Sequence, residues 1–168
     1  SKINSSWNIL SIDLKEDQVG DCNNFFRKIK KGSVLFKTGD LTTFTAENTF
    51  DLVVCVDVME HIEEDELVFR NFYNSMKKDG MLLISTPSDQ GGSDVHGDGD
   101  TSFIEEHVRD GYNIKDIETK LRKAGFSDVD ATTATGSTTY TVPTGITKLL
   151  VIITGGGGSG SSGIAATA

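Results

Sequence analysis

The chain has 168 residues, which is enough for one ordinary domain with an appendage. Its formal net charge of −9 argues against a broad surface for nucleic acid or anionic membrane, because phosphates repel a negative field. No apolar stretch reaches the roughly 20 residues that span a bilayer, and the first residues show no signal-peptide pattern. Cys22 and Cys55 lie far apart, so no disulfide framework is implied. We therefore expect a cytoplasmic protein that binds neither nucleic acid nor membrane.

Strand-like and helix-like patterns alternate along the first 130 residues. Apolar runs predict strands at residues 7–14, 33–40, 50–58 and 81–87. Helical spacing of apolar side chains predicts helices at residues 19–31, 63–78 and 113–126. The continuous apolar character of the third and fourth strands is typical of strands that helices cover on both faces. The order β-α-β-β-α-β-α predicts an α/β fold with a mainly parallel sheet.

The composition changes sharply near residue 130. From Ala131 to Ala168 the only charged side chain is Lys148, and most other residues are Thr, Ser, Gly or Ala. Such a segment buries little apolar surface by itself. We therefore expect an α/β domain at residues 1–130 and a hairpin or tail, rich in Thr, Gly and Ser, at residues 131–168.

Acidic residues follow three successive strands of the predicted sheet. Asp13 closes the first strand, Asp40 follows the second, and Asp57 closes the third. Open α/β sheets bind ligands at the carboxyl ends of their strands, where a carboxylate accepts hydrogen bonds from ribose hydroxyls. The three acids therefore favour a nucleotide-type ligand.

Three segments resemble the later motifs of class I S-adenosylmethionine-dependent methyltransferases that act on small molecules. They are "FDLVVCVDVMEHIEEDE", "MKKDGMLLISTP" and "EEHVRDGYNIKDIETKLRKAGF", and the resemblance covers about residues 7–130. It implies a Rossmann-like fold, S-adenosylmethionine as the cofactor and a small-molecule methyl acceptor. The cofactor-binding residues that it implies are Asp13 at the ribose, Asp40 and Leu41 beside the adenine, and Val56 and Asp57 at the methionine end.

The same resemblance places one histidine near the substrate. His61 lies one turn into the helix that follows the third strand, and it is the candidate catalytic residue. His107 and Arg109 are candidates for orienting the substrate, although the segment "EEHVRDGY" also fits a helix start with ordinary surface charges, which we favour. Methyl transfer is an in-line displacement that depends on alignment more than on a fixed triad.

The first motif of that family is missing from its expected place. An acidic residue followed by G-x-G-x-G should precede Trp7 together with the central strand of the sheet, and neither is there. The methionine part of the cofactor then lacks its cradle of backbone N–H groups. We therefore expect weak cofactor binding or none, and a sheet that is incomplete or permuted.

The C-terminal sequence "KLLVIITGGGGSGSSGIAATA" contains G-x-G-x-x-G at Gly155, Gly157 and Gly160. Three interpretations stay open, in this order of preference. The segment from Thr138 resembles glycine-rich domains of phage tail fibres, in which a strand pair precedes a glycine tract and which would allow self-association. It also fits a flexible linker. In the third interpretation the chain is a circular permutant whose last strand and glycine loop replace the missing motif.

Two further patterns complete the site candidates. Residues 94–105 fit the calcium-loop template at Asp94, Asp98, Gly99 and Glu105, but a mobile acidic loop over the active-site mouth is the preferred interpretation. The three histidines show no zinc spacing, so no metal site is expected. The run "EHIEEDE" is expected to be a solvated helix start.

The rival function is a non-catalytic structural or interaction protein, associated with a virion.

Overall fold

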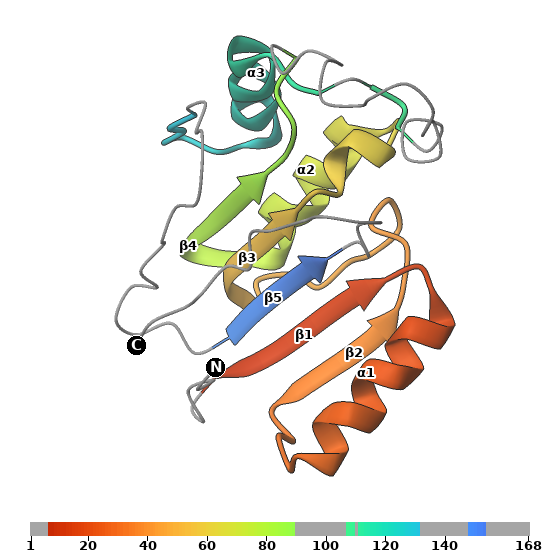
Figure 1. Ribbon diagram of the computed structural model, residues 1–168. Helices are drawn as coiled ribbons and strands as arrows, with labels where there is room; N and C mark the ends of the chain where they lie inside the picture. The colour runs from red at the N-terminus through yellow and green to blue at the C-terminus, as the bar shows by residue number, and fades with distance from the viewer. Residues whose placement is uncertain (1–6, 90–106, 110, 132–147, 154–168) are drawn as a thin grey trace, which may run out of the picture.

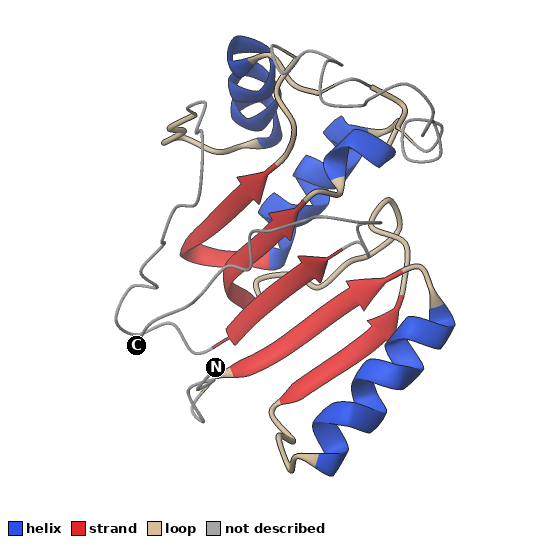
Figure 2. Ribbon diagram, viewed as in Figure 1, coloured by secondary structure: helices blue, strands red, loops and turns tan. Residues whose placement is uncertain are grey.

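The computed structural model describes residues 7–89, 107–109, 111–131 and 148–153. Five strands form one sheet in the order β2-β1-β5-β3-β4, and every pair of neighbours is parallel. Figure 2 shows the five arrows pointing the same way. The α/β, Rossmann-like prediction is therefore confirmed. The strands are β1 (Asn8–Asp13), β2 (Val34–Thr38), β3 (Phe50–Val56), β4 (Met76–Ser85) and β5 (Lys148–Ile153).

The centre of the sheet is occupied by β5, which comes from the C-terminal part of the chain (Figure 1). Leu149 pairs with Ile9 of β1 on one side and with Leu52 of β3 on the other. The expectation that the central strand is missing is therefore wrong. A central strand of a parallel sheet is covered on both faces, so a continuous apolar run fits this place. Its backbone groups are paired by the neighbouring strands on both sides. The boundary near residue 130 stays a prediction for residues outside the described part.

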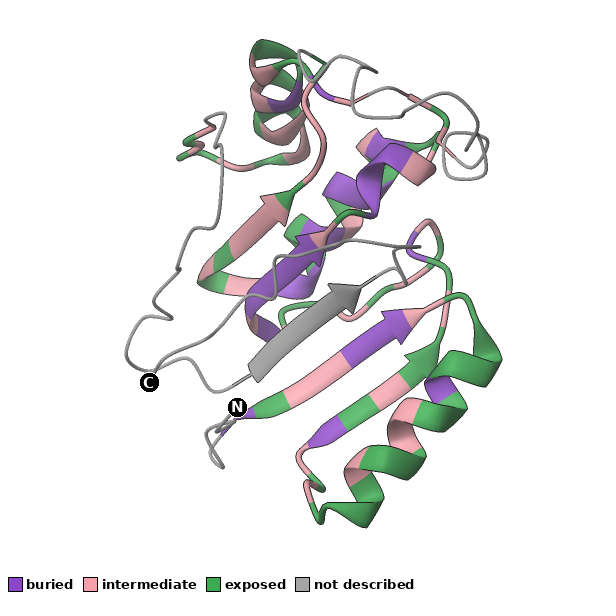
Figure 3. Ribbon diagram, viewed as in Figure 1, coloured by how far each residue is buried: buried purple, intermediate pink, exposed green. Residues whose placement is uncertain are grey.

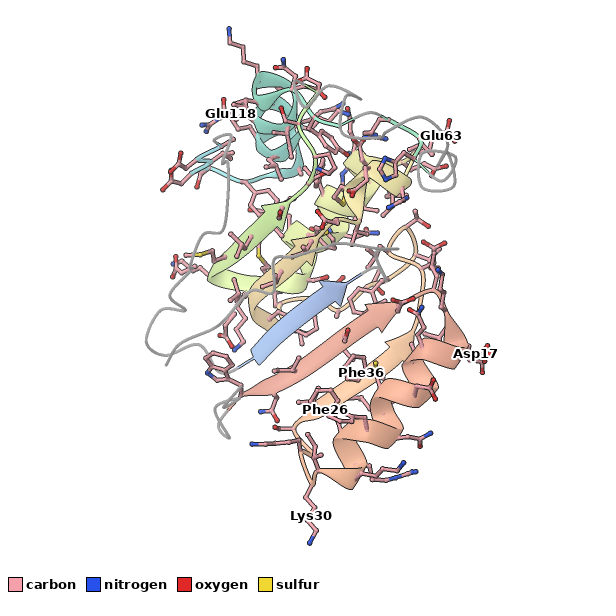
Figure 4. All side chains as sticks on the ribbon, in the orientation of Figure 1. Asp17, Phe26, Lys30, Phe36, Glu63 and Glu118 are labelled. Carbon is pink, nitrogen blue, oxygen red and sulfur yellow. The ribbon has the colours of Figure 1, made fainter. Side chains whose placement is uncertain are left out.

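Of three helices of about three turns each, the first two pack on the sheet and the third packs against the second. They are α1 (Glu16–Lys28), α2 (Asp65–Ser75) and α3 (Ile114–Ala124), and a short 3₁₀ turn, η1 (Met59–His61), precedes α2. Phe26 of α1 meets Phe36 of β2 with ring centroids 5.4 Å apart, and both are labelled in Figure 4. Because Phe36 and Val54 lie in one cross-strand row, α1 covers the face to which Val54 points.

The opposite face of the sheet carries the main core. Val53 and Cys55 of β3 pack there with Phe69 and Phe72 of α2, and all four are at most 1% exposed. Figure 3 shows buried residues concentrated on β3 and α2, whereas α1 is mostly exposed. Burial is the main reason why the pKa of the Cys55 thiol lies well above its ordinary value, and the acids Glu60 and Asp57 raise it further. Cys55 is thus a buried free cysteine.

Several predicted details differ from the structure. Leu82, Leu83 and Ile84 are only half-buried, because β4 is an edge strand of the described sheet. Phe25 of α1 and its C-cap residue Ile29 are exposed, whereas Val19 is buried and Phe26 is half-buried.

The predicted helix at residues 63–78 ends earlier, at Ser75. Met76 is buried and extended and pairs with Phe50, so the "KKDG" turn lies inside β4. Lys77 is fixed there by an ion pair of 2.7 Å with Asp51.

None of the helices in the described ranges is long and apolar enough to cross a membrane.

Candidate functional site

The carboxyl ends of β1 and β2 bring two of the predicted acids together. The backbone N–H of Gly39 donates to the Asp13 carbonyl over 2.9 Å, which ties the turn after β2 to the end of β1. The Asp13 carboxylate accepts from the Lys15 N–H, and the Asp40 carboxylate accepts from the Thr42 N–H, each over 2.8 Å. Both side chains are thereby oriented by the turns that follow their strands. Leu41, the predicted adenine contact, is buried beside them.

The carboxyl end of β5 lies between those of β1 and β3. Ile152 pairs with Ile12 of β1, and Ile153 pairs with Val56 of β3. The next residues in the sequence are "TGGGGSGSSG", which fall outside the described residues. The chain therefore leaves the sheet at its centre, between Asp13 and Asp57, and continues with the glycine-rich pattern.

Asp57 occupies the sharp turn after β3. Its φ of 49° lies in the left-handed region, which residues other than glycine rarely adopt. Its N–H donates to the Ser85 carbonyl of β4 over 2.9 Å, and this bond helps to hold the turn. Partial burial raises the pKa of the Asp57 carboxyl, and the charge of His61 acts in the opposite direction. Such held, unusual backbone conformations cluster at functional sites.

Next to this turn, the fold gathers Glu60, His61 and His107. One ligand-type atom from each side chain lies within 4.8 Å of the others. The two imidazole rings are 4.6 Å apart between centroids and meet edge to face. Glu60 is 2% exposed, and its carboxylate accepts a hydrogen bond of 3.1 Å from the Thr86 hydroxyl. Burial raises the pKa of Glu60, and its hydrogen bonds and the charge of His61 only partly oppose this.

A second cluster holds Arg109 away from solvent. Its guanidinium forms an ion pair with Asp65 and donates to the Ile62 carbonyl over 2.6 Å. The Tyr112 hydroxyl and the Lys120 ammonium also donate to Asp65, over 2.7 and 2.8 Å. Asp65 is 4% exposed. The Arg109 guanidinium, a candidate for orienting the substrate, is thus engaged by Asp65 and by the Ile62 carbonyl. It joins the segment before α3 to the start of α2.

Predicted site residues thus form two groups at one edge of the sheet. Asp13, Asp40 and Leu41 lie at β1 and β2, whereas Val56, Asp57, His61 and His107 lie at β3 and η1. The run "EHIEEDE" was expected to be solvated, and this is wrong for Glu60 and Asp65, which are buried. A helix start rich in acids gives no local signal that two of them face inward. The calcium-loop candidate, residues 94–105, lies outside the described residues.

The Asp65 cluster leads to a prediction on pH. Burial alone would raise the pKa of Asp65, but hydrogen bonds from Lys120 and Tyr112 and the charge of Arg109 outweigh it, so the pKa is lowered. A lowered folded-state pKa contributes stability above the ordinary value of about 3.9, and this is lost as pH falls through the folded-state value. The measurement is the free energy of unfolding in urea as the pH is lowered from about 5. We expect it to fall more steeply for the natural chain than for Asp65→Asn. Parallel pH profiles would contradict this assignment.

Comparisons with known proteins agree with this geometry. Residues 2–84 match the family model described as "Methyltransferase domain". Phosphoethanolamine N-methyltransferase 1 of Triticum aestivum is 35% identical over 107 residues, which are 59% of this chain and 20% of that protein. (S)-coclaurine N-methyltransferase of Papaver somniferum is 28% identical over 74 residues, 44% of this chain and 20% of that protein. The chain thus spans about a fifth of the length of these relatives.

A solved structure shares the fold. Phosphoethanolamine N-methyltransferase 2 of Haemonchus contortus, in complex with S-adenosyl-L-methionine, superimposes with a TM-score of 0.59 at 25% identity. The match covers 72% of this chain and 28% of that one. Residues 2–84 are thus similar to the methyltransferase domain family, and the described sheet has the fold of class I S-adenosylmethionine-dependent methyltransferases.

Proposed function

We propose that this chain binds S-adenosylmethionine across the carboxyl edge of β1, β5 and β3 and takes part in methyl transfer to a small-molecule amine. The observation that carries the proposal is the central position of β5. It puts the start of the glycine-rich sequence between Asp13 and Asp57, the place that a cofactor cradle would need. The third interpretation of the C-terminal segment, a circular permutant, is therefore the one that the fold favours.

The described residues suit the adenosine half of such a cofactor. Asp13 is fixed at the end of β1, where its carboxylate oxygens would accept hydrogen bonds from ribose hydroxyls, and Asp40 is fixed after β2, where it would lie beside the adenine. Leu41 adds apolar surface beside Asp40 for an adenine ring. The methionine half would meet the Val56–Asp57 turn and the glycines after β5. When bound, S-adenosylmethionine supplies an electrophilic methyl group on a sulfonium sulfur.

An amine acceptor is supported by the names of the relatives, which include N-methyltransferases for phosphoethanolamine and for (S)-coclaurine. In an in-line transfer the amine nitrogen forms a bond to the methyl carbon, the sulfur keeps the electron pair of the bond that breaks, and a proton leaves the nitrogen. His61 and Asp57 lie at the turn after β3, where they would align the amine. His107 adjoins His61 and is the candidate for contact with the rest of the acceptor.

The cytoplasmic location, a division of the chain near residue 130 and self-association through its last segment stay proposals.

Cofactor binding is tested by titrating S-adenosylhomocysteine, the demethylated product, into the purified chain by calorimetry. We expect saturable binding that Asp13→Ala weakens by about 10- to 100-fold, because a hydrogen bond to a charged group contributes roughly 1.5–3 kcal/mol. Asp17→Ala is the matched control, since Asp17 is an exposed acid on α1. Absence of binding in the folded chain would overturn the proposal and favour the non-catalytic alternative.

A further inference from the structure

The cluster of Glu60, His61 and His107 is assembled by contacts that reach far along the chain. The Val108 N–H donates to the Glu60 carbonyl over 3.0 Å, which lays the residue after His107 against η1. Arg109 adds its hydrogen bond to the Ile62 carbonyl and its ion pair with Asp65. His107 is thereby held beside His61 from two positions that follow it in the sequence. Backbone and side-chain contacts of Val108 and Arg109 thus place His107 next to η1.

The three side chains offer a consistent set of metal ligands. Two imidazoles and one carboxylate form the donor set of many catalytic zinc sites, which leave a further position open. Imidazole donors favour first-row transition ions such as Zn²⁺ or Co²⁺ over Mg²⁺ and Ca²⁺, which prefer oxygen. A bound ion holds its ligand atoms at about 2.0–2.2 Å, so they lie a little over 3 Å apart. The ligand atoms of the three side chains lie within 4.8 Å of one another, so they would have to move closer together on binding an ion.

The surroundings of Glu60 also suit a ligand. A buried carboxylate needs a compensating partner, because burial of a charge costs free energy unless it is paired or coordinates a metal. Glu60 is 2% exposed, its Oε2 accepts from the neutral hydroxyl of Thr86 over 3.1 Å, and the charged group beside it is His61, a second member of the cluster. Side chains that bind a metal are typically hydrogen-bonded to further groups that orient them, and the Thr86 hydroxyl would do this for the Glu60 carboxylate. The half-exposed histidines leave the side toward solvent accessible.

We propose that Glu60, His61 and His107 bind one divalent transition-metal ion of the zinc type at the carboxyl ends of β3 and β4. The site replaces the expectation, drawn from spacing along the chain, that no metal is bound. It leaves a coordination position for an oxygen or nitrogen atom of a small molecule. With the ion present, His61 contacts an acceptor through the metal and not as a base. Metal binding does not require cofactor binding, so either proposal can fail while the other stands.

The test is a titration of the EDTA-treated, desalted full chain with Co²⁺, followed by its visible d–d absorption and by displacement with Zn²⁺. We expect one saturable site per chain with bands typical of nitrogen and oxygen ligands. Glu60→Gln and His107→Ala should each weaken Co²⁺ binding by at least about 10- to 100-fold, the loss that removal of an outer-shell partner typically causes. Glu63→Gln is the matched control, because Glu63 is an exposed acid three residues after Glu60 (labelled in Figure 4).

Three outcomes would overturn the metal site. They are no change in absorption at saturating Co²⁺, binding that survives His107→Ala, and an intense sulfur-to-cobalt charge-transfer band, which would assign the ion to a cysteine. Circular dichroism identifies a variant that has unfolded. His107→Ala removes a half-exposed side chain and is the variant expected to stay folded if Glu60→Gln does not. Equal Co²⁺ affinity with and without S-adenosylhomocysteine would confirm that the two sites act separately.

Discussion

Replacement of Asp65 with asparagine is expected to destabilise the chain by about 3 kcal/mol, because it leaves two cations without their shared buried partner. Arg109, Lys120 and Tyr112 all direct a polar group at this carboxylate, which is 4% exposed. Removal of one member of a buried ion pair typically costs about 3–5 kcal/mol. We expect the lower end, since the Arg109 and Lys120 side chains keep 20% and 21% of their exposure and recover some hydration.

The adjacent acid provides the control for this measurement. Glu66 lies in the same first turn of α2 and forms an ion pair of 2.5 Å with Lys123, but both side chains are exposed. The favourable effect of an acid at a helix start is common to both positions, so it cancels in the comparison. Glu66→Gln should change the free energy of unfolding by less than about 1 kcal/mol. Equal effects of the two substitutions in urea unfolding would show that burial of the Asp65 cluster contributes nothing.

Replacement of Gly157 with leucine is expected to weaken binding of S-adenosylhomocysteine by at least about 10- to 100-fold. Under the proposed function, the backbone N–H groups after β5 face the carboxylate of the methionine portion, and a side chain in this loop prevents the close approach. Each lost charge-assisted hydrogen bond contributes roughly 1.5–3 kcal/mol, which gives the stated factor for a single bond. The measurement is the same calorimetric titration used for Asp13.

Gly20→Leu is the control, because nothing lies within 4 Å of a Cβ at this position of α1. It should leave the affinity unchanged. Tight binding that is indifferent to Gly157→Leu would mean that the cradle comes from elsewhere, for example from a second copy of the chain. The permuted assignment of the glycine loop would then be wrong, even though β5 completes the sheet.

The sequence alone predicted helices and strands whose formation depends on interactions between residues that are close together along the chain. The helical spacing of apolar side chains predicted α3 to within two residues, and the structure shows how its ends are capped. The Asn113 side chain accepts from the Lys115 N–H, and Gly125 adopts a φ of 122° at the helix end. The continuous apolar run of β3 predicted burial on both faces, and Leu52, Val53, Val54 and Cys55 are buried. These features depend on residues a few positions apart, so they can be seen in the sequence.

What the sequence by itself determined was thus the α/β alternation, the buried third strand and the acids at successive strand ends. Only the tertiary structure decided where the C-terminal strand lies, because an apolar run carries no information on which neighbours it pairs with. Only it brought His107 to His61 and Arg109 to Asp65, since both contacts join residues more than 40 positions apart. Such contacts come from the order of parallel strands and from helix packing, which no local pattern encodes.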